Sequence, residues 1–255
     1  REMGLSVQGF EAGTGIGGTW YWNRYPGART DSTCTVYQYW FSDELLDEWG
    51  WSERFPSQAE TERYLNFVAD KFDLRKSFKF SSRVTTASFN NETQRWLVST
   101  EDGTQLESQL LVMGTGGLKE PVYPDIPGVG DFEGESFHTS RWPHEKVDFS
   151  GKRVGIIGTA ATGIQVIQTI ASEVSHLTVF QRTPNYTIPM RNFKLEDEMR
   201  QKYRQEMPSI KQKVQETFSG HDYGTDPREF AQVPVDERRK IMERLWDDGT
   251  LAYWA

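Results

Sequence analysis

The chain has 255 residues, a formal net charge of −8 and 36% hydrophobic residues, enough for one large or two smaller domains. The acidic balance argues against nonspecific binding to nucleic acid or to an anionic membrane. Because the sequence has no apolar run of about 18 residues and no signal-peptide core near its start, we expect no membrane insertion and a cytoplasmic location.

The first residues predict a short strand, Leu5–Phe10, followed by Glu11. In a dinucleotide-binding βαβ unit, an acid at the end of the second strand holds a ribose hydroxyl. Glu11 therefore suits a ribose without a 2′-phosphate, such as the adenosine end of FAD, or is a solvated strand end. Since the first strand and glycine-rich turn of such a unit are absent, we expect the chain to be a fragment that begins inside it.

A glycine- and aromatic-rich loop follows at residues 12–31, with Trp20, Tyr21 and Trp22 in a row. These three rings cannot all face one core. Flat rings suit an isoalloxazine or a nicotinamide, although a loop packed between domains would favour them too. Arg29 and Asp31 could place opposite charges at the edge of a cofactor.

Regular elements are predicted next. Residues 55–72 have helical spacing of apolar residues and a capping box at Ser57 and Glu60. Residues 85–117 read as three strands, with turns at Asn90-Asn91 and Asp102-Gly103 and a last strand at Leu110–Met113. A connector rich in proline and glycine follows.

A second α/β unit begins at Lys152 with a strand, a helix and another strand, the pattern of a parallel sheet. Gly158-x-Ala160-x-x-Gly163 lies at its first turn, where such a loop either binds a pyrophosphate or is a close-packing turn. Alanine replaces the usual central glycine. At the end of the second strand, Arg182 and Thr183 suit the 2′-phosphate of NADP, although Arg182 could be an ordinary surface arginine.

Residues beyond 194 are charged and predict a helical subdomain. We thus predict an α/β fold with two Rossmann-like dinucleotide-binding domains, for FAD and NADP, and a helical insertion in the second. The predicted boundaries are an FAD-binding domain at 1–131, a linker at 132–150, an NADP-binding unit at 151–193 and a helical subdomain at 194–255. The single Cys34 excludes an internal disulfide, and the four histidines show no metal-ligand spacing, so no metal is predicted.

Two segments carry a resemblance to a known family. "GGTWYWNRYPGARTD" has fixed positions at Gly17, Gly18, Trp20, Tyr25, Pro26, Gly27 and Asp31, and "FEGESFHTSRWP" has them at Phe132, Gly134, His138, Trp142 and Pro143. Together they resemble the two fingerprints of the type I Baeyer–Villiger monooxygenases, in particular the phenylacetone and cyclohexanone monooxygenase group.

The resemblance implies a reaction of the full-length enzyme. NADPH reduces FAD, the reduced flavin and dioxygen form a C4a-peroxide, and this attacks a ketone to give an ester or lactone. It places the family's catalytic acid at Asp31, the partner of an arginine on a segment that this chain lacks. It implies that domain movement is coupled to catalysis by Phe132, Gly134, His138, Trp142 and Pro143. The alternative is that these side chains only pack between the domains. The fragment alone is expected to be inactive.

The resemblance also implies cofactor contacts. FAD positions fall at Glu11, Thr19, Trp20, Tyr21, Trp22, Asp31, Tyr37 and Val84. Arg29, Thr30 and Asp31 border the nicotinamide. NADP positions fall at Thr159, Ala160, Ala161, Thr162, Gly163, Ile164, Gln165, Arg182 and Thr183.

Two other functions stay open at this stage. One is a flavin monooxygenase that oxidises nitrogen or sulfur in soft nucleophiles, and the other is a noncatalytic nucleotide-binding remnant. A disulfide reductase of the pyridine-nucleotide type is excluded, because the chain has no cysteine pair. The ketone, the regiochemistry and the oligomeric state are not encoded in any pattern that we recognise.

Overall fold

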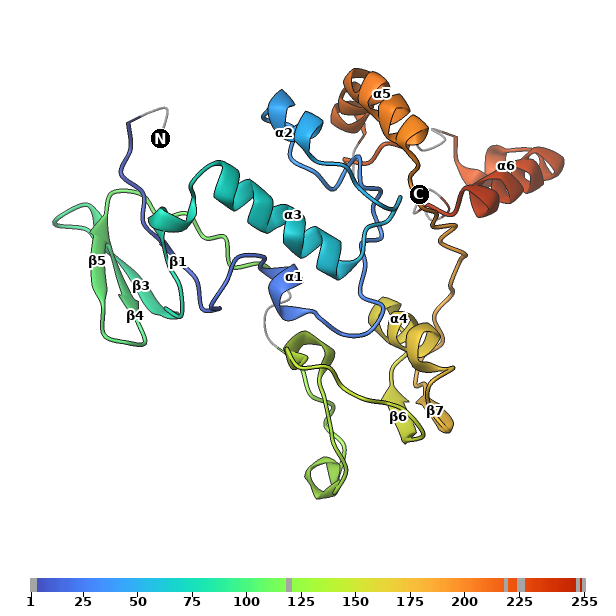
Figure 1. Cartoon of the computed structure of the whole chain (residues 1–255), viewed down its shortest axis with the longest axis horizontal. Helices are drawn as coiled ribbons and strands as arrows, with labels where there is room; N and C mark the ends of the chain where they lie inside the picture. Colours follow the sequence, from blue (N-terminus) through green and yellow to red (C-terminus); the bar gives the residue numbers. More distant parts are fainter. Residues whose placement is uncertain (1–3, 118–120, 218–219, 224–227, 251–252, 254–255) are drawn as a thin grey trace. The chain divides into compact units, whose positions relative to one another are not determined.

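The computed structural model describes residues 4–117, 121–217, 220–223, 228–250 and 253 (Figure 1). The chain divides into two compact units. Unit 1 contains residues 1–25 and 61–146, and unit 2 contains residues 26–60 and 147–255. This division is one of packing, and the domain boundaries derived from the sequence stay predictions.

Unit 1 contains two small sheets. In the first, β1 (Gly9–Phe10) pairs in parallel with β2 (Phe78–Lys79). The second is an antiparallel meander of β3 (Val84–Asn90), β4 (Arg95–Thr100) and β5 (Gln105–Ser108), drawn in green in Figure 1. Its two hairpin turns lie where the asparagine and Asp-Gly pairs predicted them.

Two predicted strands differ from the structure. The strand predicted at Leu5–Phe10 is paired only at Gly9–Phe10, and Leu5 and Val7 are exposed. The strand predicted at Leu110–Met113 is not formed, and the third strand is Gln105–Ser108 instead. Both segments are apolar enough to form strands, but among the described residues they have no neighbouring strand to supply ladder hydrogen bonds.

Unit 1 contains the helix α1 (Thr19–Trp22) and most of α3 (Gln58–Lys71). The boundary between the two units falls within α3, after Glu60. α3 agrees with the helix predicted for residues 55–72. At its start the Ser57 hydroxyl accepts from the Glu60 N–H at 3.4 Å, whereas the Glu60 carboxylate accepts from the backbone and hydroxyl of Ser52, both at 2.7 Å. The glutamate of the predicted capping box therefore also anchors the preceding loop.

The connector after β5 contains two short 3₁₀ turns, η2 (Val129–Asp131) and η3 (Thr139–Arg141). A further 3₁₀ turn, η1 (Arg75–Ser77), precedes β2.

Unit 2 contains the predicted strand–helix–strand. β6 (Arg153–Ile157) and β7 (His176–Phe180) pair in parallel with Val154 opposite Leu177, and α4 (Ala161–Ile170) connects them. The apolar face of α4 buries Val166 and Ile170, as amphipathic spacing requires. Figure 1 shows α4 in yellow beside the two strands.

The other regular elements of unit 2 are helices, which are joined by loops. It contains α2 (Asp43–Glu48), α5 (Asp197–Glu216), the 3₁₀ turn η4 (Phe230–Gln232) and α6 (Val235–Asp248). The long helices α5 and α6 follow residue 194, as predicted from the charged composition. The core of this part contains Cys34, Leu45, Trp51, Phe55, Leu195 and Met207. None of the helices within the described ranges is long and apolar enough to cross a membrane.

Candidate functional site

The turn between β6 and α4 requires glycine at two positions. Gly158 has φ +102°, a conformation that side chains rarely adopt, and its N–H donates to the Phe180 carbonyl at 2.9 Å. A Cβ at Gly163 would collide with the carbonyl oxygen of Gly158. The turn is therefore tight, and the first turn of the helix lies directly against the end of the strand.

Ala160, which replaces the usual central glycine, has an ordinary conformation. Its φ of −73° and ψ of −179° are extended and open to any residue. It is the N-cap of α4 but offers no side-chain capping hydrogen bond, and no acidic residue lies in the first turn. The start of α4 thus combines backbone N–H groups and a positive helix dipole without a competing carboxylate of its own.

The residues after β7 belong to the same predicted NADP site as the turn before α4. Arg182 and Thr183 are exposed directly after the strand. Gln181 Nε2 donates to the Thr159 hydroxyl at 2.8 Å, so the strand end and the glycine turn are joined by a side-chain hydrogen bond. Gln181, which connects two predicted groups of residues, was not itself predicted to be a site residue.

The second half of the first fingerprint packs against α4. A Cβ at Gly27, whose φ is +80°, would lie 2.5 Å from the Gln165 carbonyl oxygen. Gln165 Nε2 also donates to the Arg29 carbonyl at 3.3 Å. The structure therefore brings the loop at residues 27–29 to the helix of the predicted NADP turn.

Arg29 has a carboxylate partner that was not predicted from the sequence. Its guanidinium lies 2.7 Å from Glu53 Oε2 and donates to the Phe55 carbonyl at 3.1 Å. Asn192 also donates to Glu53 Oε2, which fixes the carboxylate. The interpretation that Arg29 and Asp31 form opposite charges at one edge is therefore incomplete, because Arg29 is already paired with Glu53.

Asp31 is an exposed residue in a turn between two anchored residues. Thr30 is buried, and its N–H donates to the Pro56 carbonyl at 3.0 Å. Cys34 is also buried, and its N–H donates to the Arg54 carbonyl at 2.8 Å. The Asp31 carboxylate itself is directed to solvent, as is Tyr37, another predicted cofactor residue.

Glu11 directly follows β1 in unit 1, at the strand end where it was predicted. Its Oε1 accepts from the Gly13 N–H at 2.7 Å, and its carbonyl accepts from the Ser82 N–H at 2.8 Å. Ser82 leads into β3, whose first residue is the partly exposed Val84. Glu11 and Val84, which are far apart in the sequence, therefore belong to adjoining segments of one unit.

The aromatic run forms the one-turn helix α1. Tyr21 is buried, and its hydroxyl contacts both the N–H and the hydroxyl of Thr14, at 3.2 and 2.7 Å. Trp20 is also buried, whereas Trp22 is partly exposed and lies edge-on to Tyr21. The expectation that the three rings cannot share one face holds, because a one-turn helix spreads them around its axis.

The two fingerprint segments contact each other within unit 1. The Arg141 guanidinium lies 5.1 Å from the ring centre of Trp22, within the range of cation–π attraction. His144 lies 5.2 Å from the Tyr21 ring. Neither Arg141 nor His144 was predicted to be a site residue, although both lie in or next to the second fingerprint.

Fixed residues of the second fingerprint make contacts within their own segment. Phe132 folds over Gly134, where an added Cβ would lie 2.6 Å from the phenylalanine ring. His138 Nδ1 accepts from the Ser140 N–H at 3.2 Å and caps η3. The Trp142 ring lies 5.3 Å from that of Phe137.

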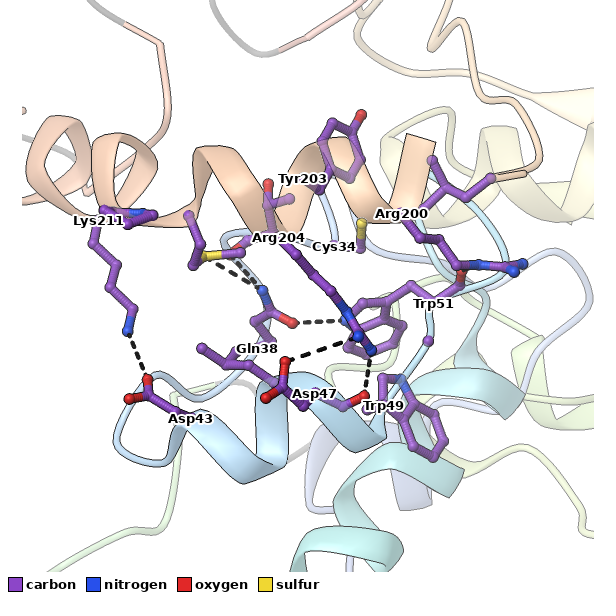
Figure 2. Close-up of a pocket in the computed structure, with 16 residues that line it drawn as sticks. Cys34, Gln38, Asp43, Asp47, Trp49, Trp51, Arg200, Tyr203, Arg204 and Lys211 are labelled. Carbon is purple, nitrogen blue, oxygen red and sulfur yellow. Dashed lines mark hydrogen bonds and ion pairs between the residues drawn. The ribbon is translucent and has the colours of Figure 1, made fainter. Parts of the chain in front are cut away.

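A pocket of about 230 Å³ lies elsewhere in unit 2, between the segment leading through α2 and the helix α5 (Figure 2). Trp49, Trp51 and Met207 supply apolar surface. Its charged groups are already paired: Lys211 lies 3.9 Å from Asp43, and Arg204 contacts Asp47. No residue predicted to hold a cofactor lines this pocket. Among the described residues, no cluster of histidine, cysteine or carboxylate groups could hold a metal ion.

Cys34 is the buried thiol at the end of this pocket, and we expect it to be unreactive. Burial, with smaller contributions from the negative charges of Glu60 and Asp222, raises the pKa of Cys34 to about 12. Because the folded protein holds this proton more tightly, its contribution to stability is complete below about pH 9 and is lost between about pH 9 and pH 12.

Cys34→Ala should therefore flatten the alkaline loss of stability. Between pH 8 and about pH 10.5, we expect the free energy of unfolding of the variant to fall by about 2 kcal/mol less than that of the wild type. Urea unfolding of both proteins at the two pH values measures this difference. Equal losses of unfolding free energy in the two proteins at alkaline pH would contradict the raised pKa of Cys34.

Comparisons with known proteins cover most or all of the chain. A family model described as flavin-binding monooxygenase-like matches residues 1–192. Acetone monooxygenase (methyl acetate-forming) of Gordonia sp. strain TY-5 is 44% identical over 255 residues, which are 100% of this chain and 48% of that protein. A Baeyer–Villiger monooxygenase of Pseudooceanicola batsensis is 41% identical over 253 residues, which are 98% of this chain and 46% of that protein.

A solved structure agrees. The complex of OTEMO with FAD and NADP has a TM-score of 0.94 and 41% identity, and the match covers 99% of this chain and 49% of that one. These matches confirm the predicted α/β fold with Rossmann-type nucleotide-binding domains and the resemblance to Baeyer–Villiger monooxygenases. The chain spans about half the length of the curated relatives that it matches.

Proposed function

This chain belongs to the flavin-binding monooxygenase-like family, and we propose that it is part of a longer enzyme that inserts one oxygen atom beside a ketone carbonyl. One observation carries the proposal: both Baeyer–Villiger fingerprints are complete at their fixed positions, and their segments contact each other through Arg141 and Trp22. The relative that forms methyl acetate from acetone supports the same class of reaction.

The proposed reaction consumes a ketone, dioxygen, NADPH and a proton, and it yields an ester or lactone, water and NADP⁺. One oxygen atom of dioxygen enters the new C–O bond and the other leaves as water, with the two reducing electrons supplied as hydride by NADPH. When bound, FAD supplies the reaction of reduced flavin with dioxygen. The residues of this chain bind and orient the two cofactors.

The strand–turn–helix of unit 2 fits NADP. The uncapped start of α4 can receive the pyrophosphate on backbone N–H groups, because the turn at Gly158 and Gly163 brings strand and helix close together. In this proposal the contact residues are Thr159, Ala160, Ala161, Thr162, Gly163, Ile164 and Gln165. Arg182 and Thr183 hold the 2′-phosphate, for which their exposure after β7 leaves room.

Unit 1 fits part of an FAD site. Glu11 directly follows a parallel strand, as an acid that holds the adenosine ribose would. Its carboxylate is held by Gly13, so its position is fixed. The remaining proposed FAD residues, taken from the family resemblance of the sequence, are Thr19, Trp20, Tyr21, Trp22, Asp31, Tyr37 and Val84.

Asp31 is the proposed catalytic residue of the chain. Its exposed carboxylate orients a cation beside the flavin, while Arg29 and Thr30 border the nicotinamide. The proposed coupling residues are Phe132, Gly134, His138, Trp142 and Pro143, which transmit movement of the nucleotide domains and do not touch the substrate. A dependence on NADPH and a buried reduced thiol suit the cytoplasm as the place of action.

Arg182→Ala should change cofactor preference. We expect kcat/KM for NADPH to fall about 10- to 100-fold, since a charge-assisted contact with the 2′-phosphate is lost. The value for NADH, which has no 2′-phosphate, should change little. Steady-state kinetics of the full-length protein with both nucleotides measures the ratio, and Arg153→Ala, at an exposed arginine of β6, is the control. An equal loss with both nucleotides would contradict this role.

The proposed activity is tested on the full-length protein reconstituted with FAD. NADPH consumption is followed with acetone, with a larger cyclic ketone, with an amine and with a sulfide, and the products are identified. Consumption stimulated by a ketone, with ester or lactone formed, supports the proposal. Oxygen transfer to the amine or sulfide alone would make the protein a heteroatom oxygenase, and failure to bind flavin would leave a noncatalytic remnant.

A further inference from the structure

A carboxylate after α5 holds the segment that follows Asp31. Asp222 Oδ2 lies 3.0 Å from the Thr33 hydroxyl and 3.3 Å from the Thr35 hydroxyl, and both hydroxyls can donate to it. The two threonines are buried, and their hydroxyl oxygens are 3.0 Å apart. The contact joins residues that are 187 and 189 positions apart in the chain.

The number of hydroxyl protons in this cluster explains why the Asp222 carboxylate is needed as an acceptor. Two hydroxyl groups have two protons, yet three short oxygen–oxygen contacts occur among Thr33, Thr35 and Asp222. A carboxylate only accepts, and it is a stronger acceptor than a hydroxyl, so both protons can be directed to Asp222. Without Asp222, the threonines would have only each other in this cluster, and one proton would lose its acceptor.

The turn that carries Asp222 is itself fixed. The Thr217 hydroxyl contacts the N–H and the carbonyl of His221, at 3.1 and 2.8 Å. The His221 ring is stacked on that of Tyr223, with centres 4.9 Å apart and planes 8° apart. Burial first, and then the charges of Asp222 and Asp31, raise the pKa of Tyr223. The hydrogen bonds of Thr217 and the stacked rings on either side of Asp222 thus support the segment that carries it.

Asp31 is the residue that this arrangement would position. Backbone hydrogen bonds from Thr30 and Cys34 hold the turn at its two ends. Thr33 lies two residues after Asp31, inside those anchors, and Asp222 supplies side-chain contacts there. Loss of these contacts would free the part of the turn that carries the Asp31 carboxylate.

We propose that Asp222 is a positioning residue for Asp31, which it holds in place through hydrogen bonds from Thr33 and Thr35. The proposal rests on the proposed function in its account of Asp31, but the structural coupling that it requires can be measured without catalysis. Asp222 acts from the helical subdomain and does not touch the reacting atoms. The helical subdomain would therefore fix the geometry of the catalytic turn.

The first readout needs no cofactor and no activity. Cys34 lies between the two threonines, so its rate of alkylation by iodoacetamide reports opening of the segment. In the full-length protein, peptide mass spectrometry follows Cys34 alone. Asp222→Ala and the double variant Thr33→Val/Thr35→Val should each speed alkylation about 10-fold, the equivalent of one net hydrogen bond. Asp222→Asn, which keeps an acceptor oxygen, should restore most of the protection.

Combining the changes tests whether they act through one contact. If they do, Asp222→Ala adds little to the double threonine variant, both in alkylation and in turnover. Turnover with ketone should fall about 10- to 100-fold in kcat while KM for NADPH stays within about 3-fold, because a misplaced Asp31 affects the reaction more than nucleotide binding. Glu216→Gln, at the exposed end of α5, is the control for loss of a nearby negative charge.

The outcomes separate the two proposals. Unchanged Cys34 alkylation in Asp222→Ala, or fully additive effects of the two sets of changes, would overturn the coupling whatever the enzyme does. Faster alkylation with unchanged ketone turnover would overturn the positioning role. If the variants show coupled Cys34 alkylation but the wild-type protein oxidises no ketone, the proposed function is refuted. The rate of flavin reduction by NADPH in Asp222→Ala then tests the positioning role. A wild-type rate would overturn that role, and a reduced rate would support it.

Discussion

Replacing Gly163 with alanine is expected to abolish tight NADP⁺ binding and to destabilise unit 2. The new Cβ would collide with the Gly158 carbonyl oxygen and lie 3.1 Å from its carbonyl carbon. Both atoms belong to the backbone, so relief requires α4 to move away from the strand. We expect a cost of about 1–3 kcal/mol in the free energy of unfolding, typical of overpacking. The helix N-terminus would also leave the position from which it receives the pyrophosphate.

Gly155→Ala is the matched control for this change. Gly155 lies in β6 of the same unit, and an added Cβ would meet only the Phe180 ring at 3.4 Å, an ordinary contact. Calorimetric titration of the full-length variants with NADP⁺, together with urea unfolding, separates binding from stability. NADP⁺ binding by Gly163→Ala within about 3-fold of wild type would contradict the role of this turn in binding the pyrophosphate, since a displaced helix should cost at least one good hydrogen bond.

Replacing Asp31 with alanine should have the largest effect on catalysis. The carboxylate is exposed in an anchored turn, and its proposed role is to orient a cation beside the flavin. We expect kcat with ketone to fall about 100-fold or more, as when one preorganised electrostatic group is lost from an active site. Because Asp31 is exposed, the free energy of unfolding should change by less than about 0.5 kcal/mol.

Two further variants sharpen this test. Asp31→Asn keeps the shape and removes the charge, so an equal loss would assign the effect to charge. Asp247→Asn, at an exposed carboxylate at the end of α6, is the control for a change in net charge. Steady-state kinetics with ketone and thermal unfolding are measured on all three proteins. Ketone turnover by Asp31→Ala within about 3-fold of the wild-type rate would exclude Asp31 as a catalytic residue, because removal of a preorganised charge costs far more.

Local patterns predicted the elements that depend on local physics. The spacing of Tyr64 and Val68 predicted α3, and both are buried. The turn at Asp102-Gly103 predicted a hairpin, and Asp102 accepts there from the Thr104 N–H at 3.0 Å. The glycines at 158 and 163 predicted a tight strand-to-helix turn, which their geometry explains. In each case the necessary contacts lie within a few residues or within one strand–helix unit.

Contacts between distant segments could not be predicted in this way. Leu110–Met113 has a strand-like composition, but a strand forms only where a partner is available. The pairing of Arg29 with Glu53 depends on which loops meet in the folded chain. Asp222 had no recognisable motif, and its two threonine partners lie 187 and 189 positions away in the chain. The fingerprints located the candidate site, whereas the residues that support it became visible only in the structure.

The most direct test of the proposed function uses isotopically labelled dioxygen. The full-length protein with FAD is supplied with NADPH, a ketone and ¹⁸O₂, and the product is analysed by mass spectrometry while NADPH is counted. The account predicts an ester or lactone that contains one ¹⁸O atom, with about one NADPH consumed per product molecule. NADPH consumption that yields only hydrogen peroxide, or label found only in an N- or S-oxide, would contradict it.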